Sequence, residues 1–476
     1  MEFNFALITT ELALFILGLA TFVLGLLVPS HSRRGLGSFA LLGLLLVLGI
    51  TIINWSNQGV LLDGMYLVDQ YATFFKILCL ISAILVVLGS FRYIDKQVGN
   101  QFEYYSTVIF TTLGMVVMAS AGDFITLYLG LELMTISFVI LVAFRSFEAK
   151  SLEAGMKYIL LAGLSSAVLL YGLSLVYGAT GTILIGEVAR EIADKGSTPL
   201  LIVGVVMLVA GLGFKISAVP FHMWSPDVYE GAPTPVTSFL AVGSKAASFA
   251  VLLRLFAGGF GGIQEQWTLL VAVLAALSML IGNLVAIPQT NIKRMLAYSS
   301  IAQAGYIMVG LVSATEAGIK GVMFYAFLYV FATIGAFTVV AIVSNQTNSD
   351  EIRDYAGLIQ RAPLAASVML ICLLSMAGIP PLAGFVGKFY LFKTVVENHM
   401  WLVYLGLIMS MVSVYYYLRV ALVMFRDEPK ESAPIHVGGA ATITLVITMV
   451  ATIILGIYPG PLAEVANMAA QSFLLK

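Results

Sequence analysis

The sequence contains few charged residues and no excess charge of either sign. Asp, Glu, Lys and Arg make up 10% of its 476 residues, whereas soluble domains average about 25%. A soluble globular protein is therefore excluded. The net charge of −1 gives no basic surface for binding nucleic acid. Hydrophobic residues make up 60%, and the mean hydropathy is +1.00, so the composition predicts an integral membrane protein.

Cysteine and nucleotide-binding motifs are also scarce. The two cysteines, Cys79 and Cys372, lie far apart in apolar runs, and neither has the CxxC neighbour that zinc or an iron–sulfur cluster requires. The sequence has no GxGxxG after a predicted strand and no GxxxxGK[ST]. We therefore expect this chain to carry no cofactor of its own, and any electron transfer to take place in other proteins.

Long apolar runs dominate the chain. A bilayer core about 30 Å thick needs about 20 apolar residues per helix, and about fourteen segments qualify. Their centres lie near Leu17, Leu45, Ala83, Leu113, Ser137, Ser166, Met207, Ser244, Leu277, Tyr306, Ala332, Gly378, Met411 and Thr448. We predict an all-α polytopic membrane protein with a single membrane domain, residues 1–476. An even number of spans places both termini on the same side.

The basic residues predict the orientation. Loops after odd-numbered segments carry Arg33, Arg34, Arg92, Lys96, Arg145, Lys150, Lys293, Arg294, Arg353, Arg361, Arg426 and Lys430. The other loops hold mainly Arg190, Lys195, Lys320 and Lys393. By the positive-inside rule the odd loops are cytoplasmic, and both termini lie on the periplasmic side of a bacterial inner membrane. The longest polar connection, 187–197, then also lies outside.

Two segments are interrupted in the same way. Pro220 lies within Val203 to Glu230, and Pro380 and Pro381 lie within Val368 to Val395. An interior proline removes a backbone hydrogen bond, which a membrane helix tolerates where protein or water satisfies the freed groups. Paired interruptions of this kind indicate a transport site.

The interruptions suggest an internal repeat. They are the fourth members of two five-helix units, 104–257 and 266–425, which follow three spans in 1–103 and precede a last span at 437–459. Because the repeat length is odd, the second unit is inserted upside down, which predicts inverted symmetry.

Four ionisable residues lie deep within apolar segments. At a rise of about 1.5 Å per residue, Glu132, Lys245 and Lys388 fall roughly 12 to 15 Å from the nearer helix end, close to the midplane, and Lys215 lies beside the first break. Burial favours the neutral form of a lysine, and a nearby carboxylate favours its charged form. Separating a Glu132–Lys215 pair would therefore make Lys215 a better proton donor. The alternative is a static buried ion pair.

Other polar residues admit two interpretations. His222, after Pro220, is either a proton relay or a packing histidine, whereas His31, His399 and His436 lie near loops. Lys157 either joins the charged row or extends to the interface. Snorkelling is expected for Lys76, Arg254 and Arg419. An interfacial aromatic belt explains Tyr415, Tyr416 and Tyr417.

Three passages carry a family resemblance: VPFHMWSPDVYEGAPTP (219–235), NIKRMLAYSSIAQ (291–303) and GIPPLAGFVGK (378–388). They resemble the antiporter-like membrane subunits of proton-pumping NADH-quinone oxidoreductase, respiratory complex I, and among these the subunit N family. The related L and M subunits and multi-subunit antiporters typically have an alanine-histidine pair where this chain has Val228 and Tyr229. Subunit M usually has glutamate at the position of Lys388. Residues 459–476 are too few for the lateral helix of subunit L.

The resemblance implies that quinone reduction in neighbouring subunits drives proton translocation. It implies partner membrane-arm subunits, K-like and M-like neighbours among them, with FMN, iron–sulfur clusters and quinone held by partners. By position, Glu132 and Lys215 form the pair, Lys157 is the sixth-span lysine, Lys245 the central relay and Lys388 the exit group. His222 matches less closely. The alternatives are a subunit of a sodium/proton antiporter and a purely structural membrane anchor.

Overall fold

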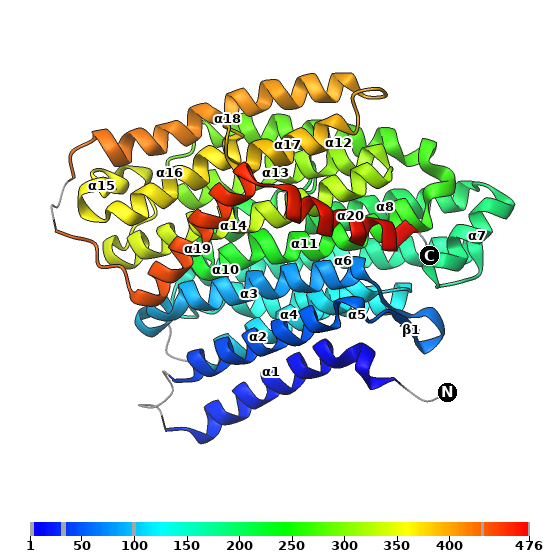
Figure 1. Ribbon diagram of the computed structural model, residues 1–476, viewed down its shortest axis with the longest axis horizontal. Coiled ribbons are helices and arrows are strands. Elements are labelled where there is room, and N and C mark those ends of the chain that lie inside the picture. Colours follow the sequence, from blue (N-terminus) through cyan, green and yellow to red (C-terminus); the bar gives the residue numbers. More distant parts are fainter. Residues whose placement is uncertain (1–3, 30–34, 98–100, 430–432, 475–476) are drawn as a thin grey trace.

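The protein is a bundle of nearly parallel and antiparallel helices (Figure 1). The computed structural model describes residues 4–29, 35–97, 101–429 and 433–474. Within these ranges, 12 helices are long and apolar enough to span a membrane, and two shorter apolar helices accompany them. The fourteen predicted segments are therefore confirmed. His31, Arg33, Arg34 and Lys430 lie outside the described residues.

The long spans share lengths of 19 to 32 residues. They are α1 (Thr9–Leu27), α2 (Gly35–Ile53), α3 (Gln70–Gln97), α4 (Gln101–Ser120), α5 (Phe124–Val142), α6 (Ala149–Thr180), α12 (Gln264–Ala286), α13 (Ile292–Ser313), α14 (Glu316–Thr347), α18 (Met400–Arg426) and α19 (Gly439–Ile457). The eighth span is composite. It runs through α10 (Thr234–Phe239), a π-helical turn at Leu240–Ser244, α11 (Lys245–Leu253) and a second π-helical turn at Arg254–Gly259.

Both predicted interruptions are present. The seventh span consists of α8 (Pro199–Lys215) and α9 (Trp224–Gly231), and the twelfth of α16 (Pro363–Ala377) and α17 (Ala383–Lys393). Smaller elements include strands β1 (Gly59–Leu61) and β2 (Tyr66–Val68), and helices α7 (Ile185–Lys195), α15 (Leu358–Arg361) and α20 (Gly460–Leu474). The antiparallel hairpin β1–β2 was not anticipated from an all-helical prediction.

The two ends of the bundle differ. Both termini, the β1–β2 hairpin and α7 lie at one end, and α15 lies at the other (Figure 1). The second is called the basic end, because its loops carry the described arginines and lysines of the odd-numbered connections. The shared position of the termini confirms an even number of spans. The five-span unit beginning with α4 starts at the basic end and that beginning with α12 at the opposite end, so the repeat is inverted.

Close glycine contacts position the helix that carries Glu132. A Cβ atom on Gly114 of α4 would lie 2.6 Å from the amide nitrogen of Met134, and one on Gly130 of α5 would lie 2.9 Å from that of Met118. Only glycine therefore permits this approach of α4 to α5. Asp123 begins α5 by accepting hydrogen bonds from the amides of Ile125 and Thr126, both at 3.0 Å. Its side chain satisfies two of the free amides at the helix start.

The half-helices α8 and α16 both end inside the bundle. Thr198 caps α8, whose last residue is Lys215, and the left-handed Gly378 (φ +89°) terminates α16. The last carbonyl groups of a helix have no intrahelical partner and carry partial negative charge. Each break therefore presents a site that attracts a cation, and a lysine lies at each one.

Candidate proton pathway

Lys215 is buried at the end of α8, with 2% of its surface exposed. Its ammonium donates to Thr135 Oγ1 at 2.9 Å and to Ser166 Oγ at 3.5 Å. Thr135 is one helical turn from Glu132 on α5, and the Glu132 carboxylate has a buried oxygen, Oε1, without a hydrogen-bond partner. Lys215 and Glu132 make no direct ion pair. The structure thus brings the predicted pair close together but leaves it open.

Lys245 follows the first π-helical turn of the eighth span, which is buried along nearly its whole length. Lys245 is 2% exposed, and its ammonium donates to the Ser300 carbonyl oxygen at 2.6 Å and also to Ser300 Oγ. Ser300 Oγ hydrogen-bonds in turn with Tyr229 Oη at 3.3 Å. Since Tyr229 belongs to α9, Ser300 on α13 joins the central lysine to the first broken span.

Lys388 lies at the second break and is 5% exposed. Its ammonium donates to the carbonyl of Ala377, the last residue of α16, at 3.1 Å, and to Ser410 Oγ at 3.0 Å. It lies 4.2 Å from the centre of the Tyr306 ring, a cation–π distance. An apolar cavity of about 620 Å³ between α17 and α18 extends from Lys388 to exposed side chains such as Met411.

Polar side chains on α13 and its neighbours occupy the region between Lys245 and Lys388. Gln303 donates to the Met376 carbonyl at 2.9 Å and to Tyr417 Oη at 3.4 Å, and accepts from Tyr325 Oη at 2.5 Å. Tyr417 also hydrogen-bonds with Ser299. A hydrogen-bonded network of hydroxyl and amide groups therefore lies between the two lysines.

The tyrosine run on α18 corrects a prediction. Tyr416 and Tyr417 are 0% exposed, with ring centres 4.4 Å apart, whereas Tyr415 is 61% exposed. Tyr416 donates to Asn283 Oδ1 at 3.0 Å, and Asn283 donates to Tyr306 Oη at 3.2 Å. The interfacial-belt interpretation was wrong for the two buried rings, because the helical period turns successive residues by about 100° and only Tyr415 faces outward.

Lys157 is separate from the buried row. It is about two-fifths exposed and pairs with Glu153 at 2.8 Å and with Asp227 of α9 at 2.7 Å. Asp227 also binds Arg294 at 2.7 Å. With Lys150 and Glu230 these residues surround a cavity of about 180 Å³ between α6, α9 and α13. Sequence reasoning missed Asp227 and Arg294, although both stand in the quoted passages.

His222 lies in the turn between α8 and α9. Its Nδ1 is buried and has no hydrogen-bond partner, as do the hydroxyl groups of the nearby Ser217 and Ser225. Buried polar atoms of this kind are ordinarily satisfied by water. No described lysine donates to His222, so its relay role stays a prediction.

Buried Lys293 pairs with Asp350 at 3.7 Å, and two of the cations for which snorkelling was expected also have acidic partners. Lys76 pairs with Glu11 at 2.7 Å, and Arg254 pairs with Asp69 at 2.8 Å while stacking on the Tyr71 ring at 4.7 Å. Snorkelling was therefore the wrong prediction for both. Arg419 donates to backbone carbonyls at the end of α12. Unlike Lys76 and Arg254, the lysines Lys215, Lys245 and Lys388 make no ion pair among the described residues.

No group of three His, Cys, Asp or Glu side chains in the described ranges is placed to hold a metal ion. Cys79 and Cys372 are buried and unpaired in separate helices, α3 and α16.

The chain is similar in sequence to known membrane proteins. Residues 121–413 match the family described as "NADH:quinone oxidoreductase/Mrp antiporter, TM". NADH-quinone oxidoreductase subunit N of Heliobacterium modesticaldum is 55% identical over 474 residues, covering 98% of this chain and 99% of the relative.

Solved structures extend the comparison. A chain of respiratory complex I from Thermus thermophilus with bound aureothin is 34% identical, with a TM-score of 0.82, covering 96% of this chain and 99% of that chain. A chain of the Mrp complex from Dietzia sp. has a TM-score of 0.88 at 20% identity, covering 98% and 97%, and shows the shared fold alone. The chain belongs to the NADH-quinone oxidoreductase subunit N family.

Proposed function

We propose that this chain is a proton-translocating membrane-arm subunit of a bacterial NADH-quinone oxidoreductase. The observation that carries the proposal is the row of three buried lysines without ion-pair partners, Lys215, Lys245 and Lys388. An ammonium in hydrocarbon costs several kcal/mol. The same chain neutralises Lys76 and Arg254 with carboxylates. Leaving three lysines unpaired is expected where each must change its charge.

The contacts support a route between them. The partly exposed Lys157–Asp227 cluster is the entrance at the basic end. Lys215 follows, and water at the buried hydroxyls of Ser217 and Ser225 bridges the first break. From Lys245 the path continues to Lys388 through the hydrogen-bonded groups of Ser299, Gln303 and Tyr417. Hydrogen-bonded hydroxyl groups both donate and accept protons.

Glu132 supplies the switch. Its carboxylate stabilises the charged form of Lys215 as it approaches and releases that stabilisation as it withdraws. Thr135 and Ser166 hold the ammonium in the open arrangement. Movement of α5 relative to α8 therefore changes the proton affinity of Lys215, and a neighbouring K-like subunit is proposed to drive it.

The remaining assignments follow from the family. FMN, iron–sulfur clusters and quinone are held by partner subunits, and K-like and M-like membrane subunits flank this chain. Lipid surrounds its apolar face. The concentration of basic residues at one end supports a cytoplasmic basic end and periplasmic termini in the bacterial inner membrane.

Substitution within the assembled complex tests the proposal. Lys215→Ala and Glu132→Ala are expected to leave assembly largely intact on native electrophoresis with activity staining, and to reduce NADH-driven proton uptake sharply in membrane vesicles. The exposed Lys195→Ala, on α7, is the matched control. Full pumping by correctly assembled Lys215→Ala complex contradicts the proposal. Sodium-dependent proton exchange without co-isolated flavin and iron–sulfur proteins assigns the chain to an antiporter instead.

A further inference from the structure

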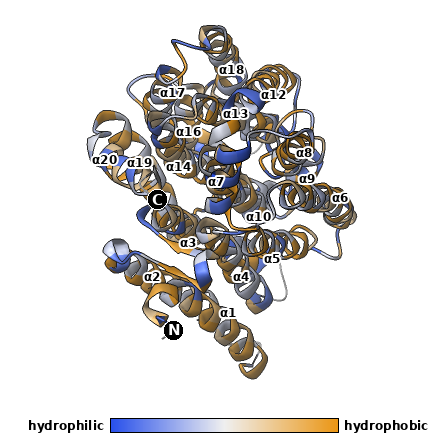
Figure 2. Ribbon diagram, turned by 90° about the vertical axis from the view of Figure 1, so that its right-hand side faces the viewer, coloured by the Kyte–Doolittle hydropathy of each residue, from blue (hydrophilic) through white to orange (hydrophobic). Residues whose placement is uncertain are grey.

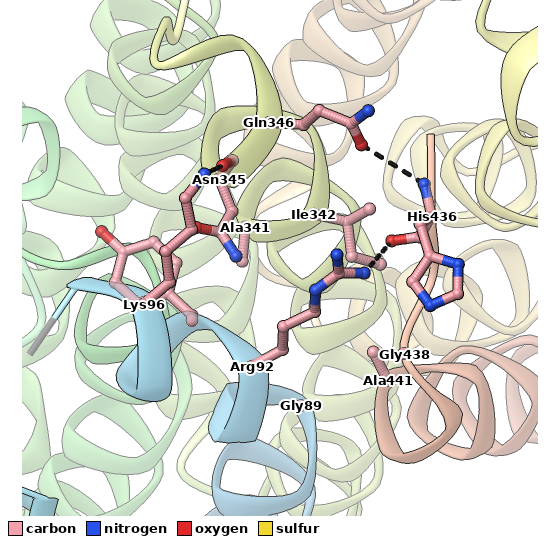
Figure 3. A pocket seen from close by; sticks show the side chains of 11 residues that line it. Gly89, Arg92, Lys96, Ala341, Ile342, Asn345, Gln346, His436, Gly438 and Ala441 are labelled. Carbon is pink, nitrogen blue, oxygen red and sulfur yellow. Dashed lines mark hydrogen bonds between the residues drawn. The ribbon is translucent and has the colours of Figure 1, made fainter. Parts of the chain in front are cut away.

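A cavity at the basic end lies outside the proton pathway. It has a volume of about 110 Å³ between the end of α3, the end of α14 and the segment that leads into α19 (Figure 3). Arg92 and Lys96 of α3 and His436 of the connecting segment line it, together with amide side chains of α14. None of its lining residues is acidic.

Most donors of the two cations remain available. Arg92 Nη1 donates to the His436 carbonyl at 2.5 Å, and Lys96 donates to the Asn345 carbonyl, as Figure 3 shows for the arginine. A guanidinium has five N–H donors and an ammonium three. Neither cation forms an ion pair among the described residues, and both are exposed. Like charges four residues apart on a helix repel each other, and an anion between them relieves that repulsion.

The cavity lies at headgroup depth. Arg92 is five residues before the end of α3, or about 7 to 8 Å at the helical rise. The first turn of α19, whose N-cap Gly438 provides no side-chain cap, also borders the cavity. Its positive dipole end adds to the field of the two cations. The volume leaves room for a phosphate group beside the two cations.

An apolar path leads from the cavity along the membrane-facing side of α3. Helix α3 lies between α2 and α19 (Figure 2). Its partly exposed residues Ile77, Ile81 and Leu88 recur at helical spacing and continue to Arg92. A hydrocarbon chain lying in this position would cover a stripe that ends at the cationic cavity.

We propose that Arg92, Lys96 and the cavity beside His436 bind the phosphate of an anionic phospholipid from the leaflet at the basic end, with its acyl chain along α3. The lipid joins α3 of the N-terminal spans to α14 and to the last span, α19. Basic pockets between transmembrane helices on this side of a membrane suit such headgroups. The site is independent of the proton pathway.

Photo-crosslinking of the detergent-purified complex tests the site. The probe is a photoactivatable phosphatidylglycerol, and the readout is its yield on peptides of α3 and of the start of α19. Unlabelled phosphatidylglycerol is expected to compete. Phosphatidylcholine is expected to compete at least tenfold less well, and millimolar inorganic phosphate not at all. Equal competition by phosphatidylcholine, or full competition by inorganic phosphate, overturns the proposal in favour of an unselective lipid contact or a free-anion site.

Variants locate the interaction. Arg92→Gln with Lys96→Gln is expected to weaken labelling by the photoactivatable phosphatidylglycerol about thirty-fold. The control, Arg353→Gln with Arg426→Gln, removes the same charge from exposed positions at the same end and should leave labelling unchanged. Gly438→Leu keeps both cations but fills the cavity, because a Cβ atom there lies 3.6 Å from Arg92 Cδ. It is expected to abolish labelling, and wild-type labelling in either cavity variant refutes the site.

Discussion

Replacing Lys245 with methionine tests whether the charge of this lysine serves proton transfer rather than the stability of the fold. The substitution removes hydrogen bonds to the Ser300 carbonyl and hydroxyl groups. The carbonyl lies within α13, where it accepts a helical hydrogen bond, and the hydroxyl keeps Tyr229 at 3.3 Å. A lost hydrogen bond costs about 1 kcal/mol, and removing a buried charge offsets that cost. We therefore expect the unfolding free energy to change by less than about 1 kcal/mol.

Arg254→Met is the matched comparison. It leaves the Asp69 carboxylate, 0% exposed, without the guanidinium that binds both its oxygens at 2.8 and 3.3 Å. Breaking a buried pair costs about 3 to 5 kcal/mol. This variant should therefore lower the thermal inactivation midpoint of the complex and the yield of assembled protein, whereas protons pumped per NADH by the complex that does assemble stay unchanged.

The assay measures both properties on one preparation. Purified complex is reconstituted into liposomes, and NADH oxidation and internal acidification are recorded together, with the inactivation midpoint taken from the same sample. Lys245→Met should keep the midpoint and lose at least nine-tenths of the coupled proton flux, as expected if this lysine is an obligatory relay. Wild-type pumping in Lys245→Met, or unchanged stability in Arg254→Met, would refute the distinction between unpaired and paired cations.

Three further substitutions probe the path. Tyr417→Phe removes only the hydroxyl group that meets Ser299 and Gln303, so pumping should fall several-fold in proteoliposomes, with Tyr415→Phe as an unaffected control. Asp227→Asn weakens the partly exposed ion pairs with Lys157 and Arg294, so the unfolding free energy should change by less than about 1 kcal/mol while proton uptake slows. An unchanged uptake rate would exclude this cluster as the proton entrance. Glu132→Gln keeps the shape of the side chain and should uncouple Lys215, which is checked by protons pumped per NADH; a normal ratio would exclude the switch.

The fold was largely predictable because few backbone conformations can cross a membrane. Apolar runs of about 20 residues indicated the fourteen segments, and Pro220 and Pro380 indicated the two breaks. The buried lysines were recognisable for the same reason, since charge within such a run is costly. The β1–β2 hairpin escaped prediction because its strands are only three residues long.

The ion-pair partners of the buried cations were not predictable from local sequence. Glu11 and Asp69 stand near segment ends, where acidic residues are common, and only packing brings them to Lys76 and Arg254. Without those contacts, all buried cations look alike. The burial of Tyr417 likewise depends on which side of α18 faces α13, a tertiary relation that a three-residue aromatic run does not reveal.

The most direct test is infrared difference spectroscopy of the complex during NADH-driven turnover, with and without ¹⁵N-labelled lysine. If unpaired lysines of this chain exchange protons, ammonium bands that shift with the isotope should decrease and recover with turnover, and part of that signal should disappear in Lys215→Met and Lys245→Met. The signal should remain in Lys76→Met. The account would be contradicted if the wild-type complex showed no isotope-sensitive ammonium signal. It would also be contradicted if that signal were identical in all three variants.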